Sequence, residues 1–193
     1  MRVVVNSLGH NADVVNYLHT ALSRVWPAAS VDAVSLADAV SRVIARAGRQ
    51  GTVHSLQFWG HGRPGAMSVG DEEVTPESFA PGHPHFAELE RLRPYLADNA
   101  FVCFKGCQTF AGGDGKRLAR AASAFFGRGV TVAGHTRLLG YDLDWGGLAR
   151  LRPDREPDWP DVDPRDKALR KPRLRERWRR FAALFRRRGA AVP

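Results

Sequence analysis

A histidine and a cysteine in this sequence are placed where they can work as a pair. His61 has glycine on both sides and shortly follows the apolar run 53–59, and Cys107 follows a glycine shortly after the apolar run 100–104. The nucleophilic form of cysteine is the thiolate, and a neighbouring histidine can take up the thiol proton and later donate it to a leaving group. The two residue types therefore indicate acyl transfer, with His61 as acid–base and Cys107 as nucleophile.

The neighbours of this pair are candidates for the rest of a site. Glycine lets a substrate backbone approach closely, and we expect Gly62 and Gly106 to provide backbone support, with amides that stabilise an oxyanion. The side chains expected to line the cleft are those of Lys105, Gln108 and His135.

The apolar pattern along the chain predicts strands that alternate with helices. Short apolar runs indicate strands, and apolar residues three and four apart indicate helices. The predicted strands cover residues 2–6, 53–59, 100–104 and 129–133, with a hairpin over 66–75; the predicted helices cover 11–25, 35–47, 86–96, where Pro94 kinks the helix or ends it early, and 114–126, capped by Asp114. This order predicts an α/β fold with a mostly parallel central sheet and helices on both faces. The loops 60–65 and 105–109 would then meet at one edge of the sheet, where ligands bind.

Two blocks of sequence resemble a known family. An apolar strand ending in His-Gly, followed by an apolar strand ending in Gly-Cys, is similar to the paired motifs of the caspase, legumain and gingipain group (clan CD) of cysteine peptidases. The stretches GHGRPGAMSVG (60–70) and KGCQTFAGGDGKRLARAASAFFGRGVTVAGHT (105–136) resemble an uncharacterised bacterial family of caspase-like domains with SHG and YGC motifs. The resemblance covers roughly residues 1–140.

The resemblance implies a hydrolase, a cysteine protease that cleaves peptide bonds in a peptide or protein substrate through a thioester acyl-enzyme. It implies the nucleophile role for Cys107, the acid–base role for His61, and a place in the oxyanion hole for Gly62. Two alternatives stay open: a non-catalytic binding or signalling module of the same fold, and another thioester chemistry at the same pair, such as acyl transfer to a different acceptor.

No cofactor and no metal ion are predicted. The chain has two cysteines, Cys103 and Cys107, without a second cluster of ligands, which makes a poor zinc site. On one strand they would lie roughly 13 Å apart, too far for a disulfide. The run 112–116 lacks the phosphate-loop pattern because Arg117 follows it. Free thiols and the absence of a long apolar segment predict a cytoplasmic protein.

Charge and composition divide the chain into three parts, predicted as a caspase-like domain over 1–150, a Pro- and Asp-rich linker over 151–164 and a basic amphipathic helical tail over 165–193. Residues 165–188 hold twelve basic and two acidic residues, so this segment alone accounts for the net charge of +9. Such a tail can bind a membrane surface, nucleic acid or an acidic protein, or pack back on the domain with its arginines in water. The oligomeric state has no signature in the sequence.

Overall fold

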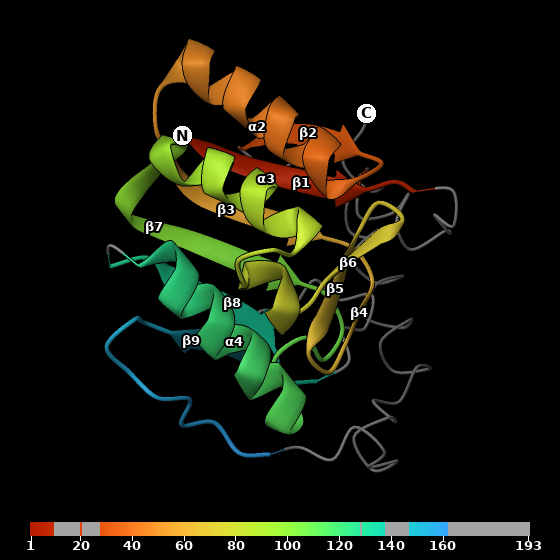
Figure 1. Ribbon diagram of the computed structural model, residues 1–193, viewed down its shortest axis with the longest axis vertical. Helices are drawn as coiled ribbons and strands as arrows, with labels where there is room; N and C mark the ends of the chain where they lie inside the picture. The colour runs from red at the N-terminus through yellow and green to blue at the C-terminus, as the bar shows by residue number, and fades with distance from the viewer. Residues whose placement is uncertain (10–19, 21–27, 128, 138–146, 162–193) are drawn as a thin grey trace, which may run out of the picture.

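A six-stranded β-sheet forms the centre of the computed structural model, which describes residues 1–9, 20, 28–127, 129–137 and 147–161 (Figure 1). Its strands are β1 (Arg2–Ser7), β2 (Ala29–Ala33), β3 (Val53–Trp59), β7 (Leu96–Lys105), β8 (Thr131–His135) and β9 (Leu148–Leu151). They lie in the order β2-β1-β3-β7-β8-β9, and every neighbouring pair is parallel except β8 and β9. The predicted α/β class with a mostly parallel central sheet is confirmed.

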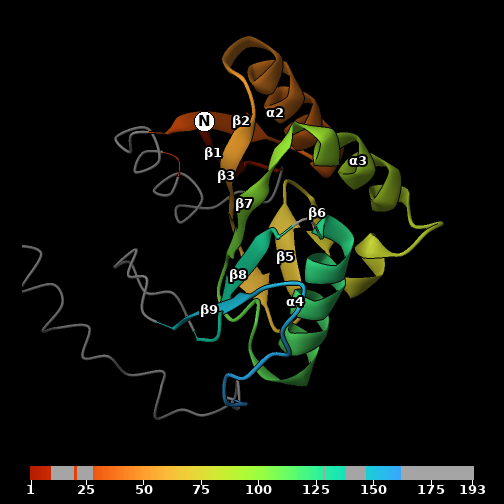
Figure 2. The same ribbon diagram turned by 90° about the vertical axis from the view of Figure 1, so that its left-hand side faces the viewer.

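Among the residues that the structure describes, three α-helices pack on the sheet: α2 (Leu36–Gln50), α3 (Pro84–Leu92) and α4 (Gly112–Phe126). All three lie on the same face (Figure 2), and α3 contacts both α2 and the 3-10 helix η1 (Pro76–Phe79), which also contacts α4. The helices predicted over residues 11–25 and 165–193 lie outside the described residues. Within the described parts of the chain, no helix is long and apolar enough to cross a membrane.

The ends of the helices follow from single residues. Ser35 caps α2, because its hydroxyl accepts a hydrogen bond from the Asp38 amide at 3.1 Å. The helix predicted over 86–96 ends at Leu92 and continues only as the 3-10 helix η2 (Arg93–Tyr95), since Pro94 cannot continue an α-helix. Asp114 was predicted as the cap of α4, but it lies in the first turn, after the N-cap residue Ala111.

The strands alternate between two buried faces. Leu56, Phe58, Val102 and Phe104 belong to the hydrophobic core under the helices. The residues between them, Gln57, Trp59, Cys103 and Lys105, therefore point to the opposite face, and all four are buried there. Both faces of the central strands are thus closed to water, as expected for a parallel sheet.

A small three-stranded sheet follows β3 directly. It consists of β4 (Gly62–Arg63), β5 (Ala66–Val69) and β6 (Glu72–Val74), and all its pairs are antiparallel. The hairpin predicted over 66–75 is therefore confirmed. Because β4 begins at Gly62, this sheet fixes the path of the chain immediately after His61.

The described part of the predicted linker, residues 151–161, is attached to the domain. Leu151 is the last residue of the edge strand β9. The ring of Trp159 stacks on Phe110 with centroids 5.7 Å apart, and its Nε1 donates to the Phe110 carbonyl at 2.8 Å. Ion pairs link Glu156 to Arg120 and Asp161 to Lys116. Prolines and acids in this segment predicted a separate linker, whereas one tryptophan and two ion pairs fasten it along α4.

Candidate active site

The two loops with the candidate catalytic residues leave neighbouring parallel strands at the same end. In the register of β3 and β7, Trp59 lies opposite Lys105. His61 and Cys107 each follow two residues later, so the chain reaches both at the same distance beyond the sheet. The Gly60 amide also lies 3.5 Å from the Lys105 carbonyl oxygen, which continues the contact of the strands to the start of the loops.

The loops touch each other through glycine. A Cβ atom on Gly62 would lie 2.9 Å from the carbonyl oxygen of Cys107 and 3.0 Å from its amide nitrogen. A Cβ atom on Gly106 would lie 3.1 Å from both the nitrogen and the Cα of Gly62 and 2.6 Å from the Met67 sulfur. Real Cβ atoms essentially never approach backbone atoms as closely as 2.9 Å, so position 62 requires glycine, whereas a side chain at position 106 would have to displace the Met67 sulfur and crowd the Gly62 backbone. The residue after His61 therefore packs directly on the backbone of Cys107.

The Thr109 side chain and backbone groups of β8 hold the turn that contains Cys107. The Thr109 hydroxyl donates to the Phe104 carbonyl at 3.0 Å and accepts from the His135 amide at 3.2 Å. The Phe110 amide donates to the His135 carbonyl at 2.9 Å. These bonds tie the end of β7 to the end of β8 and fix the turn that follows Cys107.

Gln108, directly after Cys107, has a backbone φ of 58°. It is the one non-glycine residue with positive φ among the residues that the structure describes. A side chain in this left-handed region costs free energy and persists only where the surroundings enforce it. Here the Gln108 amide donates to the Arg137 carbonyl at 3.0 Å, and its own carbonyl accepts from Ala111 at 2.9 Å. The sharp turn sets the direction in which the chain leaves Cys107.

The predicted site residues differ in their exposure. His61 is exposed, and Cys107, Gln108 and Gly62 are partly exposed. Lys105 and His135 were expected to line a cleft, but both are buried, with 1% and 0% of their surface exposed. They belong to the sheet itself, because Lys105 ends β7 and His135 ends β8.

Lys105 lies against an aromatic ring on the buried face. Its Nζ is 4.1 Å from the centre of the Trp59 ring, and the Trp59 Nε1 donates to the Gln57 side chain at 3.0 Å. Burial disfavours the ammonium form and lowers the pKa of Lys105 to about 8. The attraction of a cation to the ring partly offsets this cost.

The two thiols have different surroundings. Both cysteines are free. Cys103 is fully buried in β7, and burial raises its pKa to about 12, because a thiolate would lose its hydration there. Cys103 is therefore an inert thiol in the folded protein, whereas Cys107 lies in the turn beyond the strand and is partly open to solvent.

Several residues of the site have no signature in the sequence. Thr109, Met67 and Arg137 support the Cys107 turn through one hydroxyl, one sulfur contact and one carbonyl. Only the position of Thr109, two residues after the cysteine in a turn, gave a hint. Among the described residues, no group of three or more histidine, cysteine or acidic side chains is placed to hold a metal ion.

Comparison with known proteins identifies the family of the chain. The family model described as a domain of unknown function (DUF4347) matches residues 10–146, which is 137 of the 193 residues. The matched range includes both loops of the candidate site. No curated protein matches the chain.

Proposed function

The chain belongs to the DUF4347 family, whose description assigns no activity, and we propose that it is a cysteine peptidase of the caspase-like group with His61 and Cys107 as its dyad. The proposal rests on the sequence blocks around both residues and on their position at the ends of adjacent parallel strands. Ligands bind at this edge in α/β sheets, beyond the carboxyl ends of the strands.

One observation supports the proposal most directly, the contact between Gly62 and the backbone of Cys107. A dyad works only if a single scissile amide can touch both groups. Because the residue after His61 packs on Cys107 itself, both side chains start from backbone positions in neighbouring loops. The exposed His61 and the partly exposed Cys107 are also accessible to a polypeptide.

In the proposed reaction, His61 accepts the proton of the Cys107 thiol, and the thiolate attacks the carbonyl carbon of a peptide bond. The amides of Gly62 and Cys107 are the proposed donors to the oxyanion of the tetrahedral intermediate. His61 then gives its proton to the leaving amine, and a thioester to Cys107 remains. Water, activated by His61, hydrolyses this thioester and regenerates the thiol.

The proposed substrate is an accessible segment of a peptide or protein, because His61 is exposed and Cys107 is partly exposed. The proposed compartment is the cytoplasm, since both cysteines are free and a reducing environment preserves such thiols. Binding of an anionic partner by residues 165–188 remains a proposal from sequence alone, because this segment lies outside the described residues.

The test is the alkylation rate of each thiol, measured with limiting iodoacetamide and peptide mass spectrometry from pH 5 to pH 9. Cys107 in the wild-type protein is expected to react at pH 6, where an isolated thiol is almost entirely protonated. His61→Ala is expected to slow this reaction at pH 6 by about tenfold or more, with a smaller difference at pH 9. Burial alone slows the alkylation of Cys103. The deciding comparison is therefore the alkylation rate of Cys107 in the wild type against its rate in His61→Ala.

Cleavage itself is measured with a mixed peptide library and mass spectrometry, using Cys107→Ala as the negative control and Cys103→Ala as the matched thiol control. The expected result is cleavage by the wild-type protein and by Cys103→Ala only. Equal alkylation of Cys107 in the wild type and in His61→Ala would show that the residues do not form a dyad. That outcome would favour the alternative of a non-catalytic module on the same fold.

A further inference from the structure

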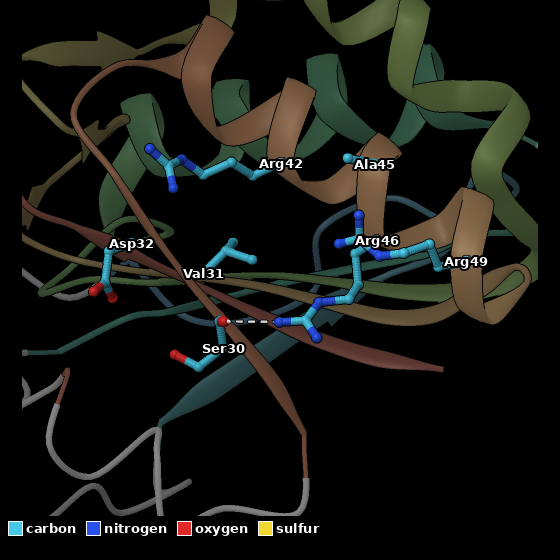
Figure 3. A pocket seen from close by; sticks show the side chains of 7 residues that line it. All are labelled: Ser30, Val31, Asp32, Arg42, Ala45, Arg46 and Arg49. Atoms are coloured by element: carbon cyan, nitrogen blue, oxygen red, sulfur yellow. Dashed lines mark hydrogen bonds between the residues drawn. The ribbon is translucent and has the colours of Figure 1, made fainter.

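A hollow of about 420 Å³ lies at the β2 edge of the sheet, far from the candidate active site in the strand order. It is formed between β2 and α2 and is shown in Figure 3. Its lining consists of three strand residues and four helix residues, namely Ser30, Val31, Asp32, Arg42, Ala45, Arg46 and Arg49. Three of these seven residues are arginines, and the sequence patterns had not singled out this region.

The three arginines follow one side of α2 at intervals of four and three residues, which places them on one helix face. Arg42 forms an ion pair with Asp38 at 2.8 Å. Arg46 reaches across to the strand, where its Nη2 lies 3.5 Å from the Ser30 carbonyl oxygen (Figure 3). Neither Arg46 nor Arg49 has an ion pair with any residue that the structure describes, so two positive charges of this hollow are not neutralised.

The acidic residue of the hollow does not neutralise them. Asp32 accepts a hydrogen bond from the Asn6 side chain at 2.9 Å, and Ser30 accepts one from the same amide at 2.8 Å. Both side chains are therefore directed toward β1 on the face opposite to α2. Val31, which lies between them in β2, contacts the hydrophobic core and forms the apolar floor of the hollow together with Ala45.

The strand in this hollow is the end of the sheet. β2 pairs with β1 alone among the described strands, so its outer edge presents backbone groups to an incoming chain. The contact of the Arg46 guanidinium with the Ser30 carbonyl oxygen is a long hydrogen bond of 3.5 Å, which is easily exchanged. A polypeptide added here would lie beside β2 with every second side chain directed toward α2.

The spacing of the arginines fits the spacing of such side chains. Residues four apart on a helix are separated by about 6 Å along its axis. Side chains on one face of a strand repeat after roughly 6.6–6.8 Å. Acidic residues at alternate positions of an added strand would thus match the separation of Arg42 and Arg46. Arg49 follows only about 4.5 Å further along the helix axis, and its long side chain spans the remaining distance of about 2 Å. A second copy of this chain does not suit the edge, because its own arginines would face these arginines.

We propose that the β2 edge binds an extended acidic peptide, which adds to the sheet as a strand and places alternate carboxylates on Arg42, Arg46 and Arg49. Backbone hydrogen bonds to β2 supply the pairing, and the arginines select the charge pattern. This inference is independent of the proposed peptidase activity, since the site lies at another edge and involves none of the same residues.

The test uses the full chain and a fluorescein-labelled ten-residue peptide of alternating glutamate and threonine, with binding followed by fluorescence anisotropy. The variant Arg46→Glu/Arg49→Glu is expected to bind at least about tenfold more weakly, because a lost attraction is replaced by repulsion. Arg46→Gln/Arg49→Gln provides a milder variant and is expected to show an intermediate loss. Thermal unfolding confirms that both variants fold.

The matched control is Arg152→Glu/Arg155→Glu, which changes the net charge equally on exposed residues next to β9, at the other edge of the sheet. The basic segment 165–188 is present in every protein, so binding by that segment would be the same in all of them. The control variant is expected to bind like the wild type. The proposal would be overturned if Arg46→Glu/Arg49→Glu and the control variant weakened peptide binding equally, or if neither of them weakened it.

Two further peptides separate strand pairing from charge alone. One is methylated at alternate backbone nitrogens, and the other has the same composition with its glutamates in one block. Both are expected to bind at least about tenfold more weakly than the alternating peptide. Equal binding of all three peptides, or full displacement by millimolar inorganic phosphate, would overturn the proposal in favour of a general anion site.

Discussion

Glycine at two positions decides how closely the loops of the candidate site approach. Gly62 and Gly106 lie back to back, and a side chain on either would meet backbone atoms of the other loop or the Met67 sulfur. Neither glycine has a positive φ, so the constraint at these positions is one of space and not of backbone conformation. The close approach of the backbone at residue 62 to the backbone at residues 106 and 107 thus depends on the absence of two side chains.

We predict that Gly62→Ala destabilises the protein and disturbs the site. The new Cβ would lie 2.6 Å from Cγ2 of Thr109 and 3.0 Å or less from two backbone atoms of Cys107. Relief of such a clash requires backbone movement, and overpacking of this kind costs about 1–3 kcal/mol. The free energy of unfolding from urea titration should fall by this amount, and the alkylation rate of Cys107 should change with it.

Gly48→Ala is the matched control for this prediction. Gly48 lies within α2, and a Cβ atom there would meet nothing within 4 Å. Alanine is the better helix former, so this variant should gain about 0.5–1 kcal/mol. A loss of stability in Gly48→Ala, or none in Gly62→Ala, would contradict the interpretation that space alone fixes these glycines.

At the residue level, the sequence predicted the positions of His61 and Cys107 but not their support. In the sequence, the end of a strand can be recognised as the point where an apolar run meets glycine. Parallel strands bring their carboxyl ends to one edge of the sheet. The bridging role of Thr109 depends on β8 lying beside β7, and no periodic pattern contains that information. For the same reason Lys105 was expected in a cleft, although it alternates with Phe104 onto a buried face.

On the scale of elements, the ends of β3 and β7 are fastened to each other by a buried pair. Trp59 and Lys105 lie opposite each other in the register, with the ammonium over the ring. Each residue stands two positions before a member of the proposed dyad. The pair therefore holds the two strand ends together at the level where the loops begin.

We predict that Lys105→Met makes the protein more stable at pH 7. The folded pKa of Lys105 is about 8, below its ordinary value of 10.5, so the folded state opposes the charge that the unfolded chain accepts. Methionine has a similar length and no charge, and the gain should be about 2 kcal/mol. Urea titrations of both proteins at pH 7 measure this difference.

The same shift predicts how the difference depends on pH. Between pH 8 and pH 10.5 the unfolded wild-type chain binds more protons at this lysine than the folded protein does. The lysine's contribution to the free energy of unfolding therefore rises with pH across this window.

The stability gap between Lys105→Met and the wild type should narrow from pH 8 upward and stay constant below it. The raised pKa of Cys103 acts above pH 9 in both proteins and largely cancels in the comparison. A gap that does not change with pH would contradict a lowered lysine pKa.

Most elements were predictable because they are locally determined. The strand 53–59, the hairpin and the start of α2 at its serine cap follow from alternation, turn residues and one hydroxyl. β9 was not predicted, because its four residues have no apolar run and form a strand only by pairing with β8. Local pattern identifies an element that has its own signal, whereas an edge strand depends on its neighbour.

On the scale of the whole molecule, the two edge strands of the sheet, β2 and β9, differ in the residues that lie against them. The β2 edge is lined by arginines of α2. At the other edge, the chain turns from β9 into the segment 152–161, which runs along α4 and is fastened by Trp159 (Figure 1). The composition of this segment suggests a linker, whereas the buried Trp159 ring and two ion pairs attach it to the domain.

We predict that Trp159→Ala releases this segment and destabilises the domain. The variant loses the stacking on Phe110 and the hydrogen bond from Nε1, and it leaves a void beside a buried phenylalanine. Truncation of a buried tryptophan costs about 3 kcal/mol or more. Trp159→Phe keeps the stacking, loses the hydrogen bond and should cost only about 1 kcal/mol. Limited trypsin digestion should cut Trp159→Ala after Arg155 much faster than the wild type, because the bond after Arg152 precedes Pro153 and resists trypsin. Equal cleavage would mean that the two ion pairs to α4 suffice to hold the segment, and that residues 152–161 fold onto the domain by charge instead of by the ring.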